Sequence, residues 1–266
     1  MSLSSPKSYT AVLGAHSVGL YRRLREGSEL LGRAEFNAAQ YPAWPAAADA
    51  LAALLQAHAQ AGGELRVLLS NHFTRVLLIP WVEQVTSPQE LASYACICFE
   101  DIYAEPAAGW TLRLSPEAAG RARLAAALPD ELLGRLQNQA KSVGWRLLSV
   151  QPYLMAAFNR FSTAVAQDGF LFIVAEPGRS SLLQARDGHW TSARAVSLAN
   201  SDAALNALIA RECALQRLDS AESATVYLHT PGRLEPFDSV AAQHLDRLWP
   251  LGQGDDLLHA MSLVVN

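Results

Sequence analysis

Lysine and cysteine are both scarce in this sequence. Only two of the 21 lysine and arginine residues are lysines, Lys7 and Lys141, so the other 19 are arginines. Neither lysine lies in a GxxxxGK[ST] phosphate-binding loop, which excludes that class of nucleotide-binding protein. The three cysteines are too few and odd in number for a secreted disulfide scaffold, and they fit the reducing cytosol.

Charge and long apolar runs are scarce as well. Charged residues make up 17% of the chain and the formal net charge is −4, which argues against a chain-wide nucleic-acid binder or a polybasic membrane binder. The longest apolar run, 76–82, is interrupted by Pro80 and falls far short of the ~18 residues that a membrane span needs. The serine-rich N-terminus has no signal-peptide core. We therefore expect a soluble cytoplasmic protein with no membrane span of its own and no nucleic-acid partner.

What the sequence does contain is a large apolar fraction arranged in short elements. Half of the residues are hydrophobic, which is enough for a sizeable core and excludes general disorder. Three strand-like runs, an alanine- and leucine-rich helix and a fully apolar strand are predicted, in that order, at about 9–13, 17–25, 28–36, 45–60 and 65–69. The first half of the chain is therefore predicted to be a βββαβ unit.

The same order of elements returns near the C-terminus. Three strands, a helix and a buried strand are predicted at about 170–175, 180–186, 189–198, 201–218 and 225–229. Asp187-Gly188, between the second and third of these strands, is typical of a two-residue hairpin turn. The two halves share almost no identical residues, so the repeat is one of pattern.

An α/β segment is inserted between the two halves. Ser87-Pro88-Gln89-Glu90 is a capping box with proline at the first helical position, which predicts the start of a helix. Strands at 75–79, 110–114, 121–128 and 145–150 and helices at 130–142 and 152–161 complete the segment. The chain is thus predicted to divide into a first half at 1–72, an inserted segment with its return helices at 73–165, and a second half at 166–266.

Four stretches in the middle of the chain can be compared with known families by their order and spacing. They are Leu65-Arg66-Val67-Leu68-Leu69-Ser70, Arg75-Val76-Leu77-Leu78-Ile79-Pro80-Trp81, the segment 124–150, and Gln151-Pro152-Tyr153-Leu154-Met155-Ala156-Ala157-Phe158. In order and spacing they resemble the bacterial pilus proteins called PilM, the cytoplasmic domain of the type II secretion protein GspL, and the MshI-like pilus proteins. These families belong with actin, hexokinase and Hsp70. The resemblance therefore implies an α/β, actin-like ATPase (ribonuclease H-like) fold with duplicated βββαβ halves and an inserted α/β segment.

The resemblance also implies a nucleotide site made of three turns between the halves. In active members of the superfamily, two turns wrap phosphates with backbone N–H groups, aspartates position Mg²⁺ or water, and a third turn lies against adenine and ribose. The matching positions, which are the candidate cofactor-binding residues, are Gly14, His16 and Ser17 in the first turn, Glu176, Gly178 and Arg179 in the second, and Gly232 and Arg233 in the third.

All three turns depart from the active pattern. No aspartate ends the first strand, and His16 stands where a small or polar residue is usual. Pro177 removes a backbone N–H donor from the second turn, and Pro231 replaces a flexible glycine in the third. Losing one electrostatic catalytic group commonly costs roughly 10²-fold in rate. We therefore expect a degenerate site with no catalytic residue, no cofactor and no hydrolysis.

Two alternatives stay open from the sequence. The first is an ATP-binding or ATP-hydrolysing relative of actin or the sugar kinases, with Mg²⁺ and with rewired turns in which Glu176 replaces the missing carboxylate. Arg179 and Arg233 would then clamp the phosphates, because guanidinium groups suit that anion. The second is a binding module for some other anion or for a peptide.

The resemblance finally implies a function in assembly. In these families a cytoplasmic ring or platform binds a short peptide of an inner-membrane protein and couples it to the assembly motor. We therefore expect a scaffold of a type IV pilus or type II secretion-like system, peripheral to the inner membrane through its partner, with homo-oligomers left open. The family's peptide groove lies by the inserted segment, and the candidate partner-binding residues are Phe73, Trp81, Phe99, Tyr103 and Trp44, the last predicted in a proline-flanked loop.

Three other groups of residues have simpler interpretations. Ser70-Asn71-His72 has the composition of a catalytic fragment, but the chain lacks a GxSxG motif, so a loop or strand-end cap is expected. The histidines have no metal-ligating spacing. Cys96 and Cys98 lack a downstream pair and are expected to be small apolar residues on a helix rather than zinc ligands. No metal site is predicted.

Overall fold

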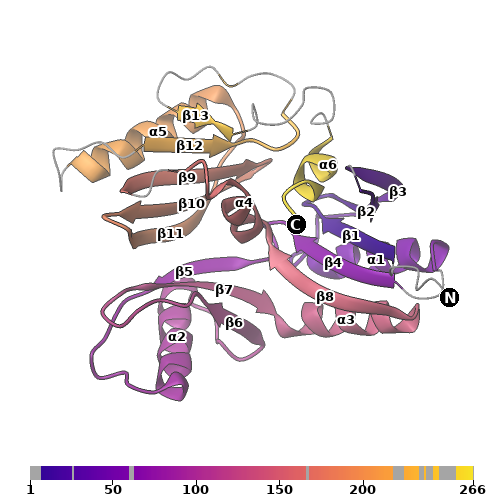
Figure 1. Ribbon diagram of the computed structural model, residues 1–266, viewed down its shortest axis with the longest axis horizontal. Coiled ribbons are helices and arrows are strands. Elements are labelled where there is room, and N and C mark those ends of the chain that lie inside the picture. The colour runs from indigo at the N-terminus through magenta and orange to yellow at the C-terminus, as the bar shows by residue number, and fades with distance from the viewer. Residues whose placement is uncertain are drawn as a thin grey trace.

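The computed structural model of the protein describes residues 7–25, 27–59, 63–165, 168–217, 225–233, 237, 242–245 and 256–265. Within these ranges the strands form two five-stranded sheets and one three-stranded sheet, shown in Figure 1. The two larger sheets have the same order of strands and the same pattern of parallel and antiparallel pairing. This repeat confirms the predicted duplicated halves.

The first large sheet begins with an antiparallel meander and continues with parallel strands. Its elements are β1 (Lys7–Leu13), β2 (Ser17–Arg23), β3 (Ser28–Glu35), α1 (Trp44–Ala57), β4 (Gly63–Leu69) and β8 (Trp145–Pro152). The strand order is β3-β2-β1-β4-β8, with β4 parallel to both β1 and β8. Strand β8 lies within the predicted inserted segment by its position in the chain, but it completes the sheet of the first half.

The second large sheet repeats this arrangement. Its elements are β9 (Gly169–Glu176), β10 (Arg179–Arg186), β11 (His189–Ser197), α5 (Asp202–Arg217), β12 (Thr225–His229) and β13 (Ala242–His244). The order is β11-β10-β9-β12-β13, with β12 parallel to β9. Asp187 and Gly188 both have positive φ in the turn between β10 and β11, which confirms the predicted hairpin. Strand β13 was not expected from the sequence.

The inserted segment forms a small sheet covered by a helix of its own, and this part lies below the second large sheet in Figure 1. Its elements are β5 (Arg75–Ile79), α2 (Pro88–Tyr103), β6 (Trp110–Leu114), β7 (Arg123–Pro129) and α3 (Asp130–Ser142). The strands are antiparallel in the order β5-β7-β6, and α2 packs its apolar side against them. The predicted capping box is present, because the Ser87 hydroxyl accepts from the backbone N–H of Glu90 and the Glu90 carboxylate accepts from that of Ser87. Helix α3 packs instead with α1 on the first large sheet.

Two short helices join the large sheets through a common apolar core. Helix α4 (Tyr153–Phe161) lies between the sheets in Figure 1, and α6 (Leu257–Ser262) lies beside β1 and β2. Their buried side chains form one cluster with residues of both sheets. Within the described ranges, no helix is both long enough and apolar enough to cross a membrane.

The sequence prediction for Trp44 was wrong. It was expected in a loop, but it begins α1 and its side chain is buried in the core of the first half. The physical reason is Pro45, whose fixed φ suits the first turn of a helix and whose missing N–H would have no intrahelical partner there.

Candidate functional site

The turn between β9 and β10 holds a buried carboxylate that links the two halves. Glu176 is only 1% exposed. The Ser70 hydroxyl donates to its Oε1 at 2.5 Å, and the backbone N–H of Asn71 donates to its Oε2 at 2.9 Å. Both oxygens are thus occupied by the segment that follows β4. Sequence reasoning had placed Glu176 at this turn, but it had not shown that Ser70 and Asn71 face it.

Asn71 extends this polar contact to a third element. Its Oδ1 accepts from the backbone N–H of Leu154, in the first turn of α4, at 3.0 Å. The neighbouring His72 places its Nε2 at 3.0 Å from the carbonyl oxygen of Pro177, in the second turn. Ser70-Asn71-His72 therefore closes the end of β4 against the opposite half of the molecule. We call Ser70, Asn71 and Glu176 the carboxylate latch.

The carboxylate latch predicts a pH dependence of stability. Burial raises the pKa of the Glu176 carboxyl above its ordinary value of 4.5, and its hydrogen bonds with Ser70 and Asn71 oppose that shift. A raised pKa in the folded state means that the fold favours the protonated carboxyl. The contribution to stability is complete below the ordinary pKa and is lost as the pH rises through the folded pKa.

A comparison with Glu176→Gln isolates this effect. We expect the free energy of unfolding of the wild type, minus that of the Gln variant, to fall as the pH rises above about 4.5. Urea unfolding of both proteins at a series of pH values measures this difference. The contributions of all other carboxylates cancel, because the two proteins share them. A difference that grows with pH would show that the hydrogen bonds outweigh burial at Glu176.

Helix α6 packs against the first and third turns. A Cβ built on Gly14 would lie 2.7 Å from the Leu258 Cδ2 atom, and the N–H of Gly14 donates to the Ser17 carbonyl oxygen at 2.9 Å. A Cβ built on Gly232, which has φ +69°, would lie 2.5 Å from the Leu257 Cα atom. Gly14 is therefore in close contact with α6 and with its own turn, and Gly232 is in close contact with the start of α6.

The remaining polar groups near the third turn are also engaged. The Tyr153 hydroxyl and the Nε2 atom of His229, which is fully buried at the end of β12, form a hydrogen bond. Arg233 forms an ion pair with Asp202, and its guanidinium lies 5.5 Å from the centre of the Phe237 ring. Within the described ranges, no cluster of three His, Cys, Asp or Glu side chains could hold a metal ion.

A cavity of about 480 Å³ lies where the first large sheet meets the inserted segment. Its aromatic lining comes from Tyr41, Trp44, Phe73 and Trp110, and its polar side chains are His16, Gln40, His72, Arg75, Glu105 and Arg179. We call it the boundary cavity. Its lining includes His16 and Arg179, which the sequence predicted to bind a cofactor. It also includes Phe73 and Trp44, which the sequence predicted to bind a partner.

Arg75 is firmly held at one side of the boundary cavity. Its Nη2 donates to the Tyr41 hydroxyl at 2.8 Å and lies 3.4 Å from Glu105 Oε1. The guanidinium also lies over two rings, 5.4 Å from the centre of Tyr103 and 5.3 Å from that of Trp110. Such contacts fix an arginine in one orientation. The sequence had not singled out Arg75 or Trp110 as individual site residues.

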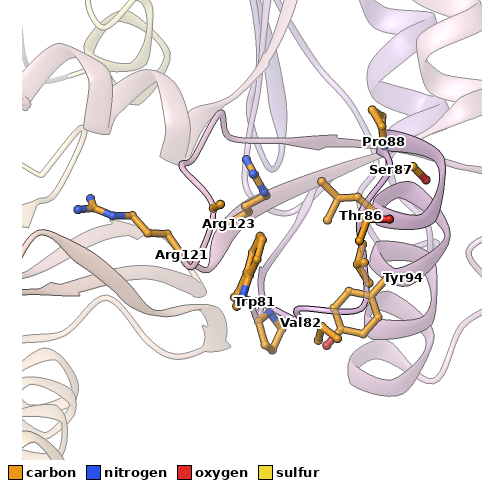
Figure 2. Close-up of a pocket in the computed structure, with 12 residues that line it drawn as sticks. Trp81, Val82, Thr86, Ser87, Pro88, Tyr94, Arg121 and Arg123 are labelled. Atoms are coloured by element: carbon orange, nitrogen blue, oxygen red, sulfur yellow. The ribbon is translucent and has the colours of Figure 1, made fainter.

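A second cavity, of about 310 Å³, lies within the inserted segment and is drawn in Figure 2. Trp81, which is 41% exposed, stands beside Val82 and Tyr94 in this view. Arg121 extends away from them, and its Nη1 lies 3.4 Å from the carbonyl oxygen of Gly188. Trp81 is therefore in a different cavity from Phe73 and Trp44.

The other two predicted partner-binding residues lie deeper in the inserted segment. Phe99 has no exposed surface and packs in the core between α2 and the three-stranded sheet, so it is not available to a partner. This is a correction, and the reason is the helical spacing that turns Ala95 and Phe99 to the same side of α2. Tyr103 is half-buried, and its hydroxyl donates to the carbonyl oxygen of Val76 at 2.6 Å. Cys96 and Cys98 are half-buried on the same helix, and neither forms a disulfide.

The comparisons with known proteins place this geometry in a fold class. No protein-family model and no curated protein sequence matches the chain. Among solved structures, it is similar to the PilM–PilN type IV pilus biogenesis complex, with a TM-score of 0.63, 14% identity and 97% of each chain covered. It is also similar to a Bacteroides thetaiotaomicron protein of actin-like ATPase fold and unknown function, with a TM-score of 0.56, 8% identity and coverage of 87% of this chain and 84% of that one. The chain therefore has the actin-like ATPase fold.

A third solved structure is similar to the chain over nearly its whole length. The cytoplasmic domain of EpsL, an inner-membrane component of the type II secretion system of Vibrio cholerae, matches with a TM-score of 0.59 and 13% identity. The match covers 97% of this chain and 94% of that one. The resemblance to PilM and GspL-like proteins that the sequence predicted is thus confirmed at the level of structure.

Proposed function

We propose that the chain is a non-catalytic assembly protein of a type IV pilus or type II secretion-like system in the cytoplasm. The observation that carries the proposal is the shared fold over 97% of the chain with both PilM, solved together with PilN, and the EpsL cytoplasmic domain. These two proteins serve related machines, and the chain matches nearly the full length of each. PilM forms a complex with PilN, and holding such a partner needs surfaces rather than chemistry.

The three turns support the non-catalytic part of the proposal. Both oxygens of Glu176 accept hydrogen bonds from the first half and the side chain is only 1% exposed, which disfavours binding of a hydrated Mg²⁺ from solvent. Gly14 and Gly232 lie against α6, where phosphates and ribose would need space. Arg233 is paired with Asp202. An ATP- and Mg²⁺-binding relative with rewired turns would need these contacts to open together.

The boundary cavity is the proposed site for the partner's peptide. It lies between the first half and the inserted segment, and its aromatic walls offer apolar surface beside charged groups, the usual combination in small binding sites. Tyr41 is 82% exposed at its edge, which is unusual for an aromatic side chain and fits a contact with a partner. In this proposal the peptide belongs to an inner-membrane protein, which recruits the chain to the membrane. Homo-oligomerisation stays a prediction.

Co-purification from the native host tests the proposal. The tagged full-length chain is expected to recover an inner-membrane component of a pilus or secretion machine after crosslinking. Tyr41→Ala, at the edge of the boundary cavity, is expected to lower that recovery severalfold. Trp81→Ala is the matched control, because it also removes an exposed aromatic ring but from the other cavity. Recovery of no such component with the wild type would contradict the proposed function.

A further inference from the structure

The boundary cavity is lined by more arginines than carboxylates. Two arginines line it, Arg75 on β5 and Arg179 at the start of β10. His16 in the first turn and His72 after β4 lie beside them, and burial lowers the pKa of His72 so that its neutral ring is favoured. Among the described residues that line the cavity, Glu105 is the one carboxylate. That carboxylate lies 3.4 Å from Arg75, so it is already engaged.

Arg179 is the unsatisfied group in this cluster. Its Nε atom is buried and has no hydrogen-bond partner in the described part of the chain. Glu176 does not supply one either, since its hydrogen bonds are with Ser70 and Asn71. Burial, and then the charge of Arg75, lower the pKa of the Arg179 guanidinium. A buried N–H donor without a partner is costly, and a bound anion would satisfy it.

The rest of the cavity indicates what carries the anion. Trp44, Trp110 and Phe73 give it apolar walls, and its volume of about 480 Å³ exceeds what a small inorganic anion fills. A guanidinium beside aromatic walls suits a carboxylate attached to apolar groups, as in an acidic residue flanked by apolar side chains.

We propose that the boundary cavity binds the side-chain carboxylate of an acidic residue in the partner's peptide, with Arg179 as its principal donor. Apolar residues beside that acidic residue pack on Trp44 and Trp110. This inference rests on the proposed function, since it names the chemistry of the same peptide. In this proposal the second turn, which contains Arg179, binds the carboxylate of a peptide instead of the phosphate of a nucleotide.

Two pools of synthetic peptides test the inference by isothermal titration into the full-length chain. The first pool is N-acetyl-X-Glu-X-amide, where X is any of Leu, Ile, Val, Phe or Trp, and the second is the matched N-acetyl-X-Gln-X-amide pool. A charge-assisted hydrogen bond predicts that the glutamate pool binds about tenfold tighter. Arg179→Met is expected to remove this preference, and Arg179→Lys to keep part of it because the charge remains.

Arg135→Met is the matched control variant. The Arg135 guanidinium lies 5.5 Å from the centre of the Trp44 ring, but Arg135 does not line the boundary cavity, so the preference for glutamate should persist. Equal affinity for the two pools, binding of neither pool, or an undiminished preference in Arg179→Met would overturn the inference. Acetate or inorganic phosphate that binds as tightly as the glutamate pool would overturn the assignment to a peptide.

The outcome is separable from that of the proposed function. A glutamate preference without recovery of a pilus or secretion component contradicts the proposed function alone. Recovery of such a component by both the wild type and Arg179→Met, with no glutamate preference, contradicts this inference alone.

Discussion

A Gly232→Ala variant should lose about 2–5 kcal/mol of its free energy of unfolding. Gly232 has φ +69°, a conformation that costs an alanine roughly 1–2 kcal/mol. The new Cβ would also meet backbone atoms of Leu257 at 2.5 to 2.8 Å, so the start of α6 would have to move. Overpacking of this kind typically costs a further 1–3 kcal/mol or so. Urea unfolding followed by circular dichroism measures the loss.

Gly188→Ala is the matched control for this prediction. Gly188 also has φ +69°, but a Cβ built there would have no neighbour within 4 Å. The control should therefore show only the backbone cost of about 1–2 kcal/mol. The difference between the two variants measures the contact between the third turn and α6. Equal losses in the two variants would contradict the packing of α6 against this turn.

A Glu176→Ala variant is expected to lose about 2–4 kcal/mol of its free energy of unfolding at pH 5. The substitution removes the acceptor of the Ser70 hydroxyl and of the buried Asn71 N–H, and each unsatisfied buried donor costs roughly 1–3 kcal/mol. Because burial raises the pKa of the Glu176 carboxyl, its contribution to stability is expected to be larger at acidic than at neutral pH. Chemical unfolding at pH 5 gives the value.

Glu83→Ala serves as the control for the carboxylate latch. Glu83 is an exposed acidic residue in the loop after β5, and its removal should change the stability by less than about 0.5 kcal/mol. A Glu176→Ala variant that behaves like Glu83→Ala would show that the latch does not hold the halves together. A loss that Glu176→Gln partly restores would support the hydrogen-bonding role.

The order of helices and strands could be predicted from the sequence because it depends on local patterns. Alternating and continuous apolar runs located the strands of both halves, Asp187-Gly188 located a hairpin, and Ser87 with Glu90 located the start of α2. Such signals act within a few residues of one another. The pairing of β8 with the first large sheet is different. It joins residues such as Leu65 and Leu147, which are 82 positions apart in the chain, and no local pattern encodes it.

The candidate site could be predicted only in part, for the same physical reason. The amino-acid sequence alone shows that the three turns differ from those of an active nucleotide site. Pro177, which removes a backbone N–H from the second turn, is one example. The contacts that fill those turns are not visible, because Leu258 approaches Gly14 from the far end of the chain. Phe99 illustrates the opposite error, since an aromatic residue in a promising region proved to be part of the core. The convergence of Arg75 and Arg179 on one cavity likewise required the fold.

Isothermal titration of ATP with Mg²⁺ into the full-length chain tests the central claim most directly. The claim is that an actin-like ATPase fold has been kept for its surfaces, with its nucleotide turns closed by the carboxylate latch and by α6. The account predicts no binding tighter than about 100 μM, which corresponds to roughly −5.5 kcal/mol. Binding tighter than this limit that is abolished by Glu176→Ala would contradict it.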